Sequence, residues 1–320
     1  MTDKLALVKD KTSPANARSI TDKLVAQVGR VILGKDREIR LAIACLLARG
    51  HLLIEDVPGV GKTLLARSLA IVLGLDYQRI QFTSDMLPAD IIGVSIFEQG
   101  ANQFRFHRGP LFAQLILADE VNRATPKAQS ALLEAMEEHQ VTADGDTYDL
   151  PDPFFVIATQ NPTHQIGTFP LPESQLDRFL MRIGLGYPAE PLERKLLLGA
   201  DRRSLLDTLQ VQISEPEIAE LQKTADAVFV SDALLDYTQA LIRYTRELPE
   251  IEIGLSPRGA VDLISAARCW ALIHGHEGVT PEDIKAVFPA VVSHRLRTRN
   301  DSSVPEHTIA DYVLESVPVP

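Results

Sequence analysis

The stretch from Asp56 to Thr63, which reads DVPGVGKT, decides the fold of this chain. The apolar run His51–Glu55 before it is typical of a strand, and from Leu64 to Leu73 apolar residues recur at helical spacing. In a glycine-rich loop between a strand and a helix, successive backbone N–H groups can surround phosphate oxygens, and the helix adds the positive end of its dipole. The stretch therefore predicts a loop that binds the phosphates of a nucleoside triphosphate.

The residue types within the loop suit this chemistry. Gly59 and Gly61 allow the backbone to approach a ligand closely, whereas Lys62 is expected to reach the phosphates and Thr63 to bind Mg²⁺. Asp56 stands where the general pattern has glycine, which leaves the phosphate affinity open. A tight turn that serves packing alone would show similar residues. We expect the nucleotide to contact Pro58, Gly59, Val60, Gly61, Lys62, Thr63 and Leu64.

Two carboxylates follow another apolar run, Leu115–Ala118. In open α/β sheets ligands bind at the carboxyl ends of the strands, which is where Asp119 and Glu120 would lie. We expect Asp119 to hold Mg²⁺ through its water shell and Glu120 to polarise a water molecule for attack on the terminal phosphate. Acidic residues also occur at strand ends simply because water solvates them. The assignment of this pair to a nucleotide site therefore depends on the presence of the phosphate loop.

A polar amide follows a third strand-like run, Phe154–Thr159. Asn161 at this strand end can hydrogen-bond the terminal phosphate or the attacking water without adding charge. The dipeptide Asn161-Pro162 is equally an ordinary turn signal. A turn does not explain why three strand ends of one chain carry a phosphate loop, a carboxylate pair and an amide, so we assign Asn161 to the same site.

Strand-like and helix-like segments alternate from Val31 to Gly186, which is typical of a parallel sheet covered by helices. The fold class is therefore α/β, with an αβα nucleotide-binding domain over residues 1–188 that includes an N-terminal helical segment. From Glu190 the pattern is helical, and the pairs Ser256-Pro257 and Thr280-Pro281 predict helix starts. We predict an all-α lid domain over residues 189–300 and a tail over 301–320. The predicted strands are His51–Glu55, Tyr77–Phe82, Leu115–Asp119, Phe154–Thr159 and Met181–Leu185.

Two hairpin-like insertions interrupt the first domain. In the first, Val94–Phe97 and Gln103–Phe106 flank a turn. In the second, Gln140–Thr142 and Thr147–Leu150 flank another turn. Hairpins between the strands of an α/β core are usually surface loops, so their residues alone assign them no function.

Composition limits the function classes. With a net charge of −11 over 320 residues, the chain lacks the basic surface that sequence-independent binding to DNA or RNA requires, although a local basic hairpin would escape this argument. The longest clean apolar run, Leu41–Ala48, is too short to span a bilayer, and the N-terminus lacks the apolar core of a signal peptide. We expect a cytoplasmic protein without an integral membrane segment, in which Cys45 and Cys269 are buried thiols.

Four segments together resemble the MoxR family of AAA+ ATPases, in its helix-2-insert clade: VPGVGKT, ADEVNRATPKAQSALLEAMEEHQVT, ATQNPTHQIGTFPLPESQLDRFL and LSPRGA. The resemblance runs from about Val25 to about Arg297. It implies a P-loop αβα sandwich with a five-stranded parallel sheet, a helical lid, nucleotide bound between the two, and assembly into a ring, expected to be a hexamer. It also implies that both hairpins face a ring pore or a partner.

The same resemblance implies roles for single residues. Asn161 matches the residue called sensor 1, and Arg178 in LDRF matches the arginine finger that one subunit lends to its neighbour. Arg258 in SPR matches sensor 2; a cation in the first turn of a helix is disfavoured by the helix dipole, and contact with a phosphate would reverse that disadvantage. Arg123 is family-like as well, and it either contacts the adjacent subunit or supports the carboxylate pair.

The nucleotide is expected to be ATP. The chain has no Asn-Lys-x-Asp motif, which would read guanine. By resemblance to where related ATPases hold the base, adenine is expected against Val31, Ile32 and Gly34. The expected cofactors are therefore ATP and Mg²⁺.

Three functions follow from these residues. The leading one is an ATP-hydrolysing factor that remodels or matures protein partners, and the resemblance implies partners with a von Willebrand factor A domain. The second is a nucleotide-gated binding module with slow hydrolysis; Glu120 and Arg178 favour the first. The third, a DNA-directed motor, is suggested by Arg105, His107 and Arg108 on the first hairpin and opposed by the acidic net charge.

Overall fold

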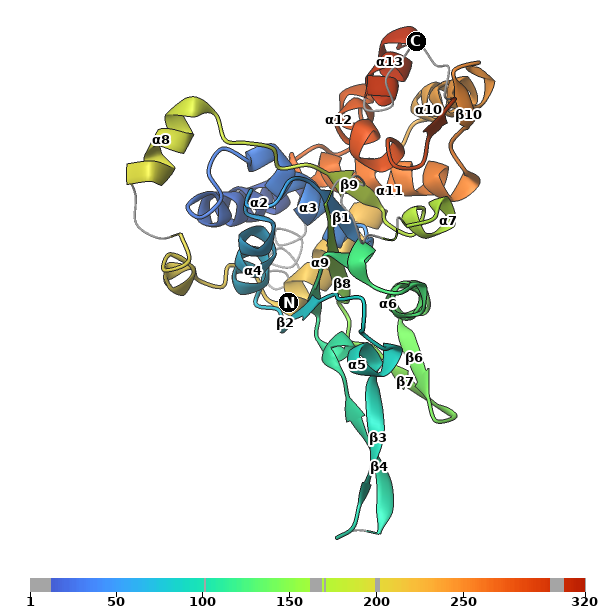
Figure 1. The fold of residues 1–320 in the computed structure, drawn as a ribbon. Helices are drawn as coiled ribbons and strands as arrows, with labels where there is room; N and C mark the ends of the chain where they lie inside the picture. The colour runs from blue at the N-terminus through green and yellow to red at the C-terminus, as the bar shows by residue number, and fades with distance from the viewer. Residues whose placement is uncertain are drawn as a thin grey trace, which may run out of the picture.

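The computed structural model describes residues 13–100, 102–161, 169, 171–198, 202–299 and 308–319. At its centre lies a sheet of five parallel strands in the order β2, β5, β8, β1, β9 (Figure 1). The five predicted strands are confirmed, and each observed end lies close to its predicted position. Their bounds are β1 Leu52–Glu55, β2 Tyr77–Gln81, β5 Leu115–Asp119, β8 Phe155–Gln160 and β9 Met181–Ile183.

Both faces of the sheet are covered, which is why the central strands are apolar throughout. Because successive side chains of a strand point to opposite faces, Leu115 and Leu117 of β5 join one buried cluster and Ile116 and Ala118 join the other. Helices α2, α3 and α4 contribute to the first cluster, and α5 and α6 to the second. Their bounds are α2 Pro14–Gly29, α3 Asp36–Leu47, α4 Lys62–Leu73, α5 Pro88–Ile92 and α6 Pro126–Glu138.

After β9 the chain is mainly helical, as predicted for the lid. Ser256 and Thr280 cap two of these helices by accepting hydrogen bonds from Gly259 N and Asp283 N, in agreement with the Ser-Pro and Thr-Pro pairs that predict helix starts there. The helices are α7 Glu173–Leu176, before β9, and then α8 Glu190–Leu198, α9 Glu215–Asp226, α10 Asp232–Glu247, α11 Pro257–Ile273, α12 Pro281–Val292 and α13 Ile309–Ser316. Among the described residues, the short 3-10 helices are η1 Pro110–Phe112 and η2 Val121–Arg123, both before β9, and η3 Leu206–Thr208.

Two details of this region differ from the prediction. A small antiparallel ribbon joins β10 (Ile251–Ile253) to β11 (Arg297–Thr298). The segment predicted as a tail contains α13, whose Ile309, Ala310 and Val313 are buried against the rest of the lid, because three apolar residues on one helical face suffice to anchor it. Residues 300–307 of the predicted tail and lid end lie outside the described residues.

The lid shares its core with the nucleotide-binding domain. Helix α11 packs against α2 and α3, and α9 packs against α3. Buried residues of α3, α11 and α12 belong to one continuous apolar cluster. The predicted boundary at residue 188 therefore marks a change of secondary structure, whereas the hydrophobic core continues across it.

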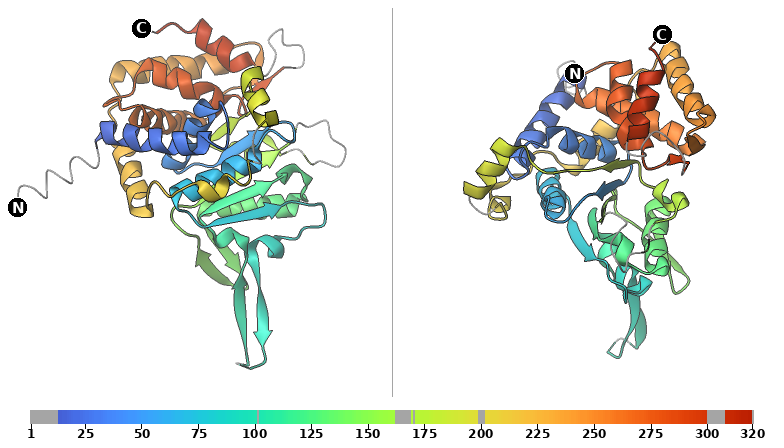
Figure 2. Two further views of the ribbon diagram at one scale, coloured as in Figure 1. Left: turned by 90° about the vertical axis from the view of Figure 1, so that its left-hand side faces the viewer. Right: turned by 45° about the horizontal axis from the view of Figure 1, so that its top comes forward.

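Both predicted hairpins are present. Strand β3 (Gly93–Glu98) pairs with β4 (Gln103–Arg108), and β6 (Gln140–Ala143) pairs with β7 (Asp146–Asp149). The β3–β4 hairpin projects far from the body of the molecule (Figure 2). Phe106 of β4 stacks on Tyr148 of β7 with ring centroids 4.3 Å apart, so the two hairpins support one another.

The basic side chains of the first hairpin have an acidic neighbour. Glu98 Oε1 lies 3.6 Å from Arg105 Nη1 and 3.7 Å from His107 Nε2. This carboxylate reduces the positive charge that suggested a DNA-directed function, since a polyanion needs a surface of uncompensated cations.

Two further expectations concern the cysteines and the membrane. Cys45 and Cys269 are free and buried. Burial raises the pKa of Cys45 and raises that of Cys269 to about 12, so both remain thiols.

In the part of the chain that the structure describes, no helix has the length and apolar character needed to cross a bilayer.

Candidate active site

The predicted phosphate loop joins β1 to α4. Gly59 and Gly61 have φ angles of 89° and 101°, a region that glycine adopts without strain. A Cβ atom on Gly59 would meet no heavy atom within 4 Å, so the loop faces open space there. Gly61 is the N-cap of α4 and has no side chain to accept from the first helical N–H groups. The loop therefore presents the end of a helix to an anion, which fits a nucleotide phosphate.

Lys62 connects this loop with the end of β8. Its side chain is largely buried, and Nζ donates to the carbonyl oxygens of Asp56 at 2.6 Å and Gln160 at 3.3 Å and to Asn161 Oδ1 at 3.1 Å. Burial lowers the pKa of Lys62, while the carboxylates of Asp56 and Asp119 act in the opposite direction. The structure thus brings together Lys62 and Asn161, which the sequence analysis assigned to one site.

Asp56, the departure from the general loop pattern, has a structural role. Its Oδ1 accepts a hydrogen bond from Val57 N at 2.7 Å, and its Oδ2 accepts one from Gly186 N at 2.5 Å. Gly186 lies between β9 and α8. The carboxylate therefore ties the phosphate loop to the segment that leads into the lid.

We expect Asp56→Ala to lower the free energy of unfolding by about 1–3 kcal/mol, because two backbone donors lose a charged acceptor. The measurement is urea denaturation followed by circular dichroism. Asp76→Ala, at an exposed position of the same domain, is the control and should change the free energy by less than about 0.5 kcal/mol. Equal stability of the two variants would show that the Asp56 contacts contribute nothing.

Asp119 ends β5 with a largely buried carboxylate. Oδ1 accepts from Thr159 Oγ1 at 2.5 Å, and Oδ2 accepts from Arg79 Nε at 3.1 Å and Nη2 at 2.6 Å. These charge-assisted bonds orient the carboxylate toward the end of the sheet. Thr63 lies in the first turn of α4, so a hydroxyl and a carboxylate, the oxygen ligands that Mg²⁺ prefers, come from adjoining elements.

Glu120 is held by polar groups from several elements. It has a left-handed backbone, with φ 59°, and its N–H donates to Thr159 Oγ1 at 2.9 Å. Oε1 accepts from Asn161 Nδ2 at 3.3 Å, and Oε2 accepts from Gln81 Nε2 at 3.2 Å and lies 3.0 Å from Arg123 Nε. Arg123 therefore contacts Glu120 of the carboxylate pair, and its contact with an adjacent subunit stays a prediction.

The segment expected to hold adenine lies beside the phosphate loop. Val31 and Ile32 are buried, and a Cβ atom on Gly61 would lie 3.5 Å from Ile32 Cδ1. Gly34 has a φ of 68°, and a side chain there would collide with Leu192 of α8. The segment is therefore apolar and lies between the phosphate loop and α8, which is the kind of environment that a planar base needs.

Arg178 and Arg258 do not lie at the phosphate loop of their own chain. Arg178 precedes β9 in a segment whose Leu180 N donates to His51 O, so it lies at the amino ends of the strands. The phosphate loop lies at the carboxyl ends, and β1 from His51 to Asp56 spans roughly 16 Å at about 3.3 Å per residue. The structure therefore does not bring Arg178 to the phosphate loop of its own chain.

One carboxylate binds both arginines at this opposite end. Glu137, in the last turn of α6, accepts from Arg178 Nη1 at 2.6 Å through Oε2 and from Arg258 Nη2 at 2.9 Å through Oε1. Arg178 Nη1 also donates to Leu133 O at 2.8 Å. Arg258 is thus separated from its own phosphate loop as well, and the two guanidinium groups form one cationic pair.

Several residues around the site were not identified from the sequence. Arg79 and Gln81 alternate along β2, and this polar alternation was a signal that one face of the strand is solvated. That they contact Asp119 and Glu120 depends on the pairing of β2 with β5, which local patterns do not reveal. Thr159 and Glu137 gave no local signal, because their partners lie far away in the sequence.

Comparisons with known proteins agree with this geometry. Residues 51–181 match the family described as ATPase family associated with various cellular activities (AAA), and residues 243–312 match the AAA lid domain. The fold is similar to that of a crystal structure provisionally described as an ATPase from Cytophaga hutchinsonii, with a TM-score of 0.89. The two sequences are 35% identical, and the match covers 99% of each chain. The fold and the site define an AAA+ ATPase.

Similar sequences narrow this class. The chain is 42% identical to YeaC of Bacillus subtilis over 93% of this chain and 94% of that protein. It is 40% identical to the chaperone MoxR1 of Mycobacterium tuberculosis, over 93% and 82% of the two chains, and 32% identical to MoxR of Methylorubrum extorquens, over 95% and 96%. The chain belongs to the MoxR family of AAA+ ATPases, and the resemblance found in its sequence is confirmed.

Proposed function

We propose that this ATPase works as a ring, expected to contain six subunits, in which Arg178 and Arg258 of one subunit act on the nucleotide bound by the next. ATP hydrolysis in the ring would drive the remodelling or maturation of protein clients. A chaperone role is supported by the name of the relative MoxR1, and the family resemblance favours clients with a von Willebrand factor A domain.

One observation carries the ring arrangement. Arg178 and Arg258 converge on Glu137 at the end of the sheet opposite to the phosphate loop. Two guanidinium groups close enough to share a carboxylate are close enough to bind one phosphoryl group. Because exposed ion pairs contribute only about 0–1 kcal/mol, a more highly charged phosphate from another subunit can replace Glu137. A head-to-tail contact between two different surfaces generates a ring when the rotation from one subunit to the next closes.

Within one chain, Lys62 and the loop residues Pro58 to Leu64 would hold the phosphates, while Val31, Ile32 and Gly34 would contact adenine. Thr63 and Asp119 would hold Mg²⁺, which when bound neutralises phosphate charge. Arg79 and Thr159 keep the Asp119 carboxylate in place.

Glu120 would accept a proton from the attacking water. Asn161 donates to Glu120 and accepts from Lys62, so the amide can orient the carboxylate and the water together. Arg178 and Arg258 of the neighbour would stabilise the charge that develops on the transferred phosphoryl oxygens. Turnover would then require assembly.

Mixing two inactive variants tests this arrangement. Lys62→Ala keeps both arginines but loses its phosphate contact, and Arg178→Ala keeps its phosphate loop but lacks the finger. Each alone is expected to hydrolyse ATP slowly, whereas mixed rings contain some complete composite sites, so the mixture should recover part of the wild-type rate. The measurement is the steady-state ATPase rate as a function of the mixing ratio.

Mixed assembly is verified by co-purification through a tag on one variant. With mixing verified, an ATPase rate equal to the sum of the separate variants would refute the transfer of Arg178 between subunits. Full activity of Arg178→Ala alone would do the same.

A further inference from the structure

The two arginines of the cationic pair come from separate parts of the chain. Arg178 follows α7, next to the central sheet, whereas Arg258 lies in the first turn of α11 in the lid. A pair that must fit one phosphoryl group needs a fixed spacing, because errors of about 1 Å can cost about a hundredfold in rate. Some contact must therefore fasten the Arg178 segment to the lid.

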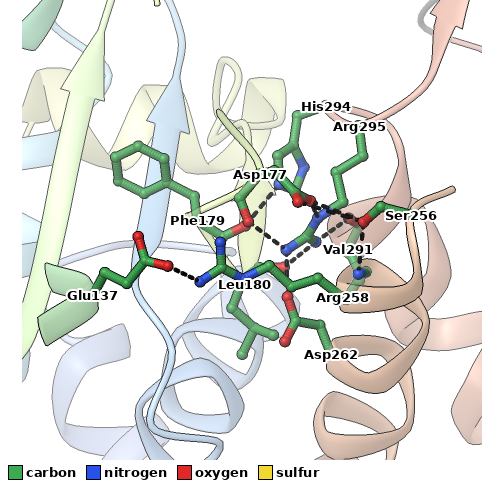
Figure 3. A network of polar contacts seen from close by, with 11 residues as sticks. Glu137, Asp177, Phe179, Leu180, Ser256, Arg258, Asp262, Val291, His294 and Arg295 are labelled. Atoms are coloured by element: carbon green, nitrogen blue, oxygen red, sulfur yellow. Dashed lines mark hydrogen bonds and ion pairs between the residues drawn. The ribbon is translucent and has the colours of Figure 1, made fainter. Parts of the chain in front are cut away.

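Arg295, just after α12, provides that contact (Figure 3). Its side chain is only 2% exposed. Nε donates to Asp177 Oδ1 at 2.7 Å, Nη1 to Leu180 O at 3.0 Å and Val291 O at 2.6 Å, and Nη2 to Asp177 O at 3.2 Å and Asp262 Oδ2 at 2.5 Å. All five N–H donors of the guanidinium are thereby satisfied.

These partners surround Arg178 on both sides. Asp177 precedes it, Leu180 follows two residues later, and between them Phe179 O accepts from His294 Nε2 at 2.8 Å. Three backbone carbonyls that flank Arg178, those of Asp177, Phe179 and Leu180, are thus bound by the residues that follow α12. The Arg178 side chain remains free to reach outward toward Glu137.

The same cluster extends to the helix that carries Arg258. Asp262 lies one turn after Arg258 in α11, and the Ser256 hydroxyl, which caps α11, donates to Asp177 Oδ2 at 3.4 Å. Partial burial raises the pKa of Asp262, and Arg295 opposes that shift, so the half-buried carboxylate depends on its cation. A buried guanidinium with two carboxylates holds one geometry, because losing a partner leaves an uncompensated charge.

We propose that Arg295 is a positioning residue for ATP hydrolysis: through Asp177 and Asp262 it fixes Arg178 and Arg258 as one rigid unit that the lid presents to the nucleotide of the neighbouring subunit. The inference rests on the proposed function, since it assumes that the arginines act between subunits. The inference adds that the position of the lid in one subunit controls the rate at which the next subunit hydrolyses its ATP.

The test places the same substitution on either side of a composite site. Asp177→Asn keeps the shape of the side chain but removes the charge facing Arg295. In the first arrangement, Asp177→Asn is added to the Lys62→Ala chain, which supplies the arginines of the composite site. In the second arrangement, it is added to the Arg178→Ala chain, which supplies the phosphate loop. We expect at least a tenfold loss of the recovered ATPase rate in the first arrangement and less than a twofold change in the second, with an unchanged KM for ATP in both.

The matched control is Asp226→Asn. Asp226 of α9 pairs with Arg49 Nη1 at 3.0 Å, so it also joins the lid to another segment through a carboxylate and an arginine, but it does not contact the Arg178 segment. Asp226→Asn should change the rate equally little in the two arrangements. A general loss of stability would act in both arrangements, which distinguishes it from positioning.

Equal losses in the two arrangements, or no loss in either, would overturn the inference while leaving the proposed function intact. Circular dichroism and co-purification verify folding and mixing. Should Asp177→Asn fail to fold, Asp262→Asn replaces it and carries the same expectation. If the parent mixture of Lys62→Ala and Arg178→Ala recovers no activity despite verified mixing, the proposed function fails and the inference fails with it.

Discussion

Lys62→Ala is expected to abolish detectable binding of ATP while leaving the fold intact. The amine has three acceptors around the phosphate loop, two of them backbone carbonyls. Removing a largely buried cation from a charged ligand costs roughly 3–5 kcal/mol, which weakens binding by more than about a hundredfold. Isothermal titration with Mg-ATP measures the affinity, and circular dichroism verifies the fold.

Lys127→Ala is the matched control for this experiment. Lys127 is exposed in the first turn of α6, in the same domain. It should bind ATP like the wild-type protein, since no contact of the phosphate loop changes. Wild-type affinity in Lys62→Ala would show that the loop from Asp56 to Thr63 does not bind the phosphates.

Glu120→Gln is expected to bind ATP with nearly unchanged affinity and to hydrolyse it at least about a hundredfold more slowly. The amide keeps the shape of the side chain and leaves Asp119 in place, but it is a far weaker base for the attacking water. A radioactive phosphate-release assay resolves the slow rate, and equilibrium dialysis measures the binding. Glu138→Gln, at an exposed position of α6, should retain the wild-type rate.

Two results would contradict this assignment. Unchanged turnover would place the base at another residue, and a parallel loss of binding would make Glu120 a residue that holds the nucleotide. The slow variant also addresses the client: loaded with ATP, it should retain a protein with a von Willebrand factor A domain longer than the wild-type protein does, because hydrolysis would otherwise end the bound state.

Local sequence patterns were sufficient for the elements of the nucleotide-binding domain. Strands β1, β5 and β8 are short, mainly apolar runs, whereas β2 and β9 mix polar and apolar residues, and the phosphate loop depends on glycines and a lysine within eight consecutive residues, Asp56 to Thr63. Such features arise from backbone preferences and side-chain periodicity, which act over a few residues. The helix starts at Ser256 and Thr280 were predictable for the same reason.

Segments with weaker local patterns were predicted less well. Helix α13 follows a polar segment with proline, and it is stable because Ile309 and Val313 pack against the rest of the lid. The helical lid is confirmed, but its packing was not predicted: α11 packs against α2 and α3 from the N-terminal part of the chain. Packing between segments that lie hundreds of residues apart leaves no periodic signal in either of them.

The positions of the candidate site residues could be predicted from the sequence, whereas most of their contacts could not. The sequence predicted that Asp119, Glu120 and Asn161 lie at strand ends and that Lys62 lies in the loop after a strand. Their mutual contacts depend on β1, β8 and β5 being neighbours in the sheet. The partners of Asp119, above all Arg79, depend on the pairing of β2 with β5. Sheet order is a property of the tertiary fold, because each strand can pair in register with several others.

The arginines show most clearly what only the tertiary structure decides. Sequence resemblance assigned Arg178 and Arg258 to nucleotide chemistry, yet it did not place them at the end of the sheet opposite to their own phosphate loop, nor at Glu137. Arg295 had no sequence signal at all, because its partners Asp177 and Asp262 lie 118 and 33 positions away. A motif defines which groups a residue can bind, whereas the distance and direction of those groups come from long-range packing.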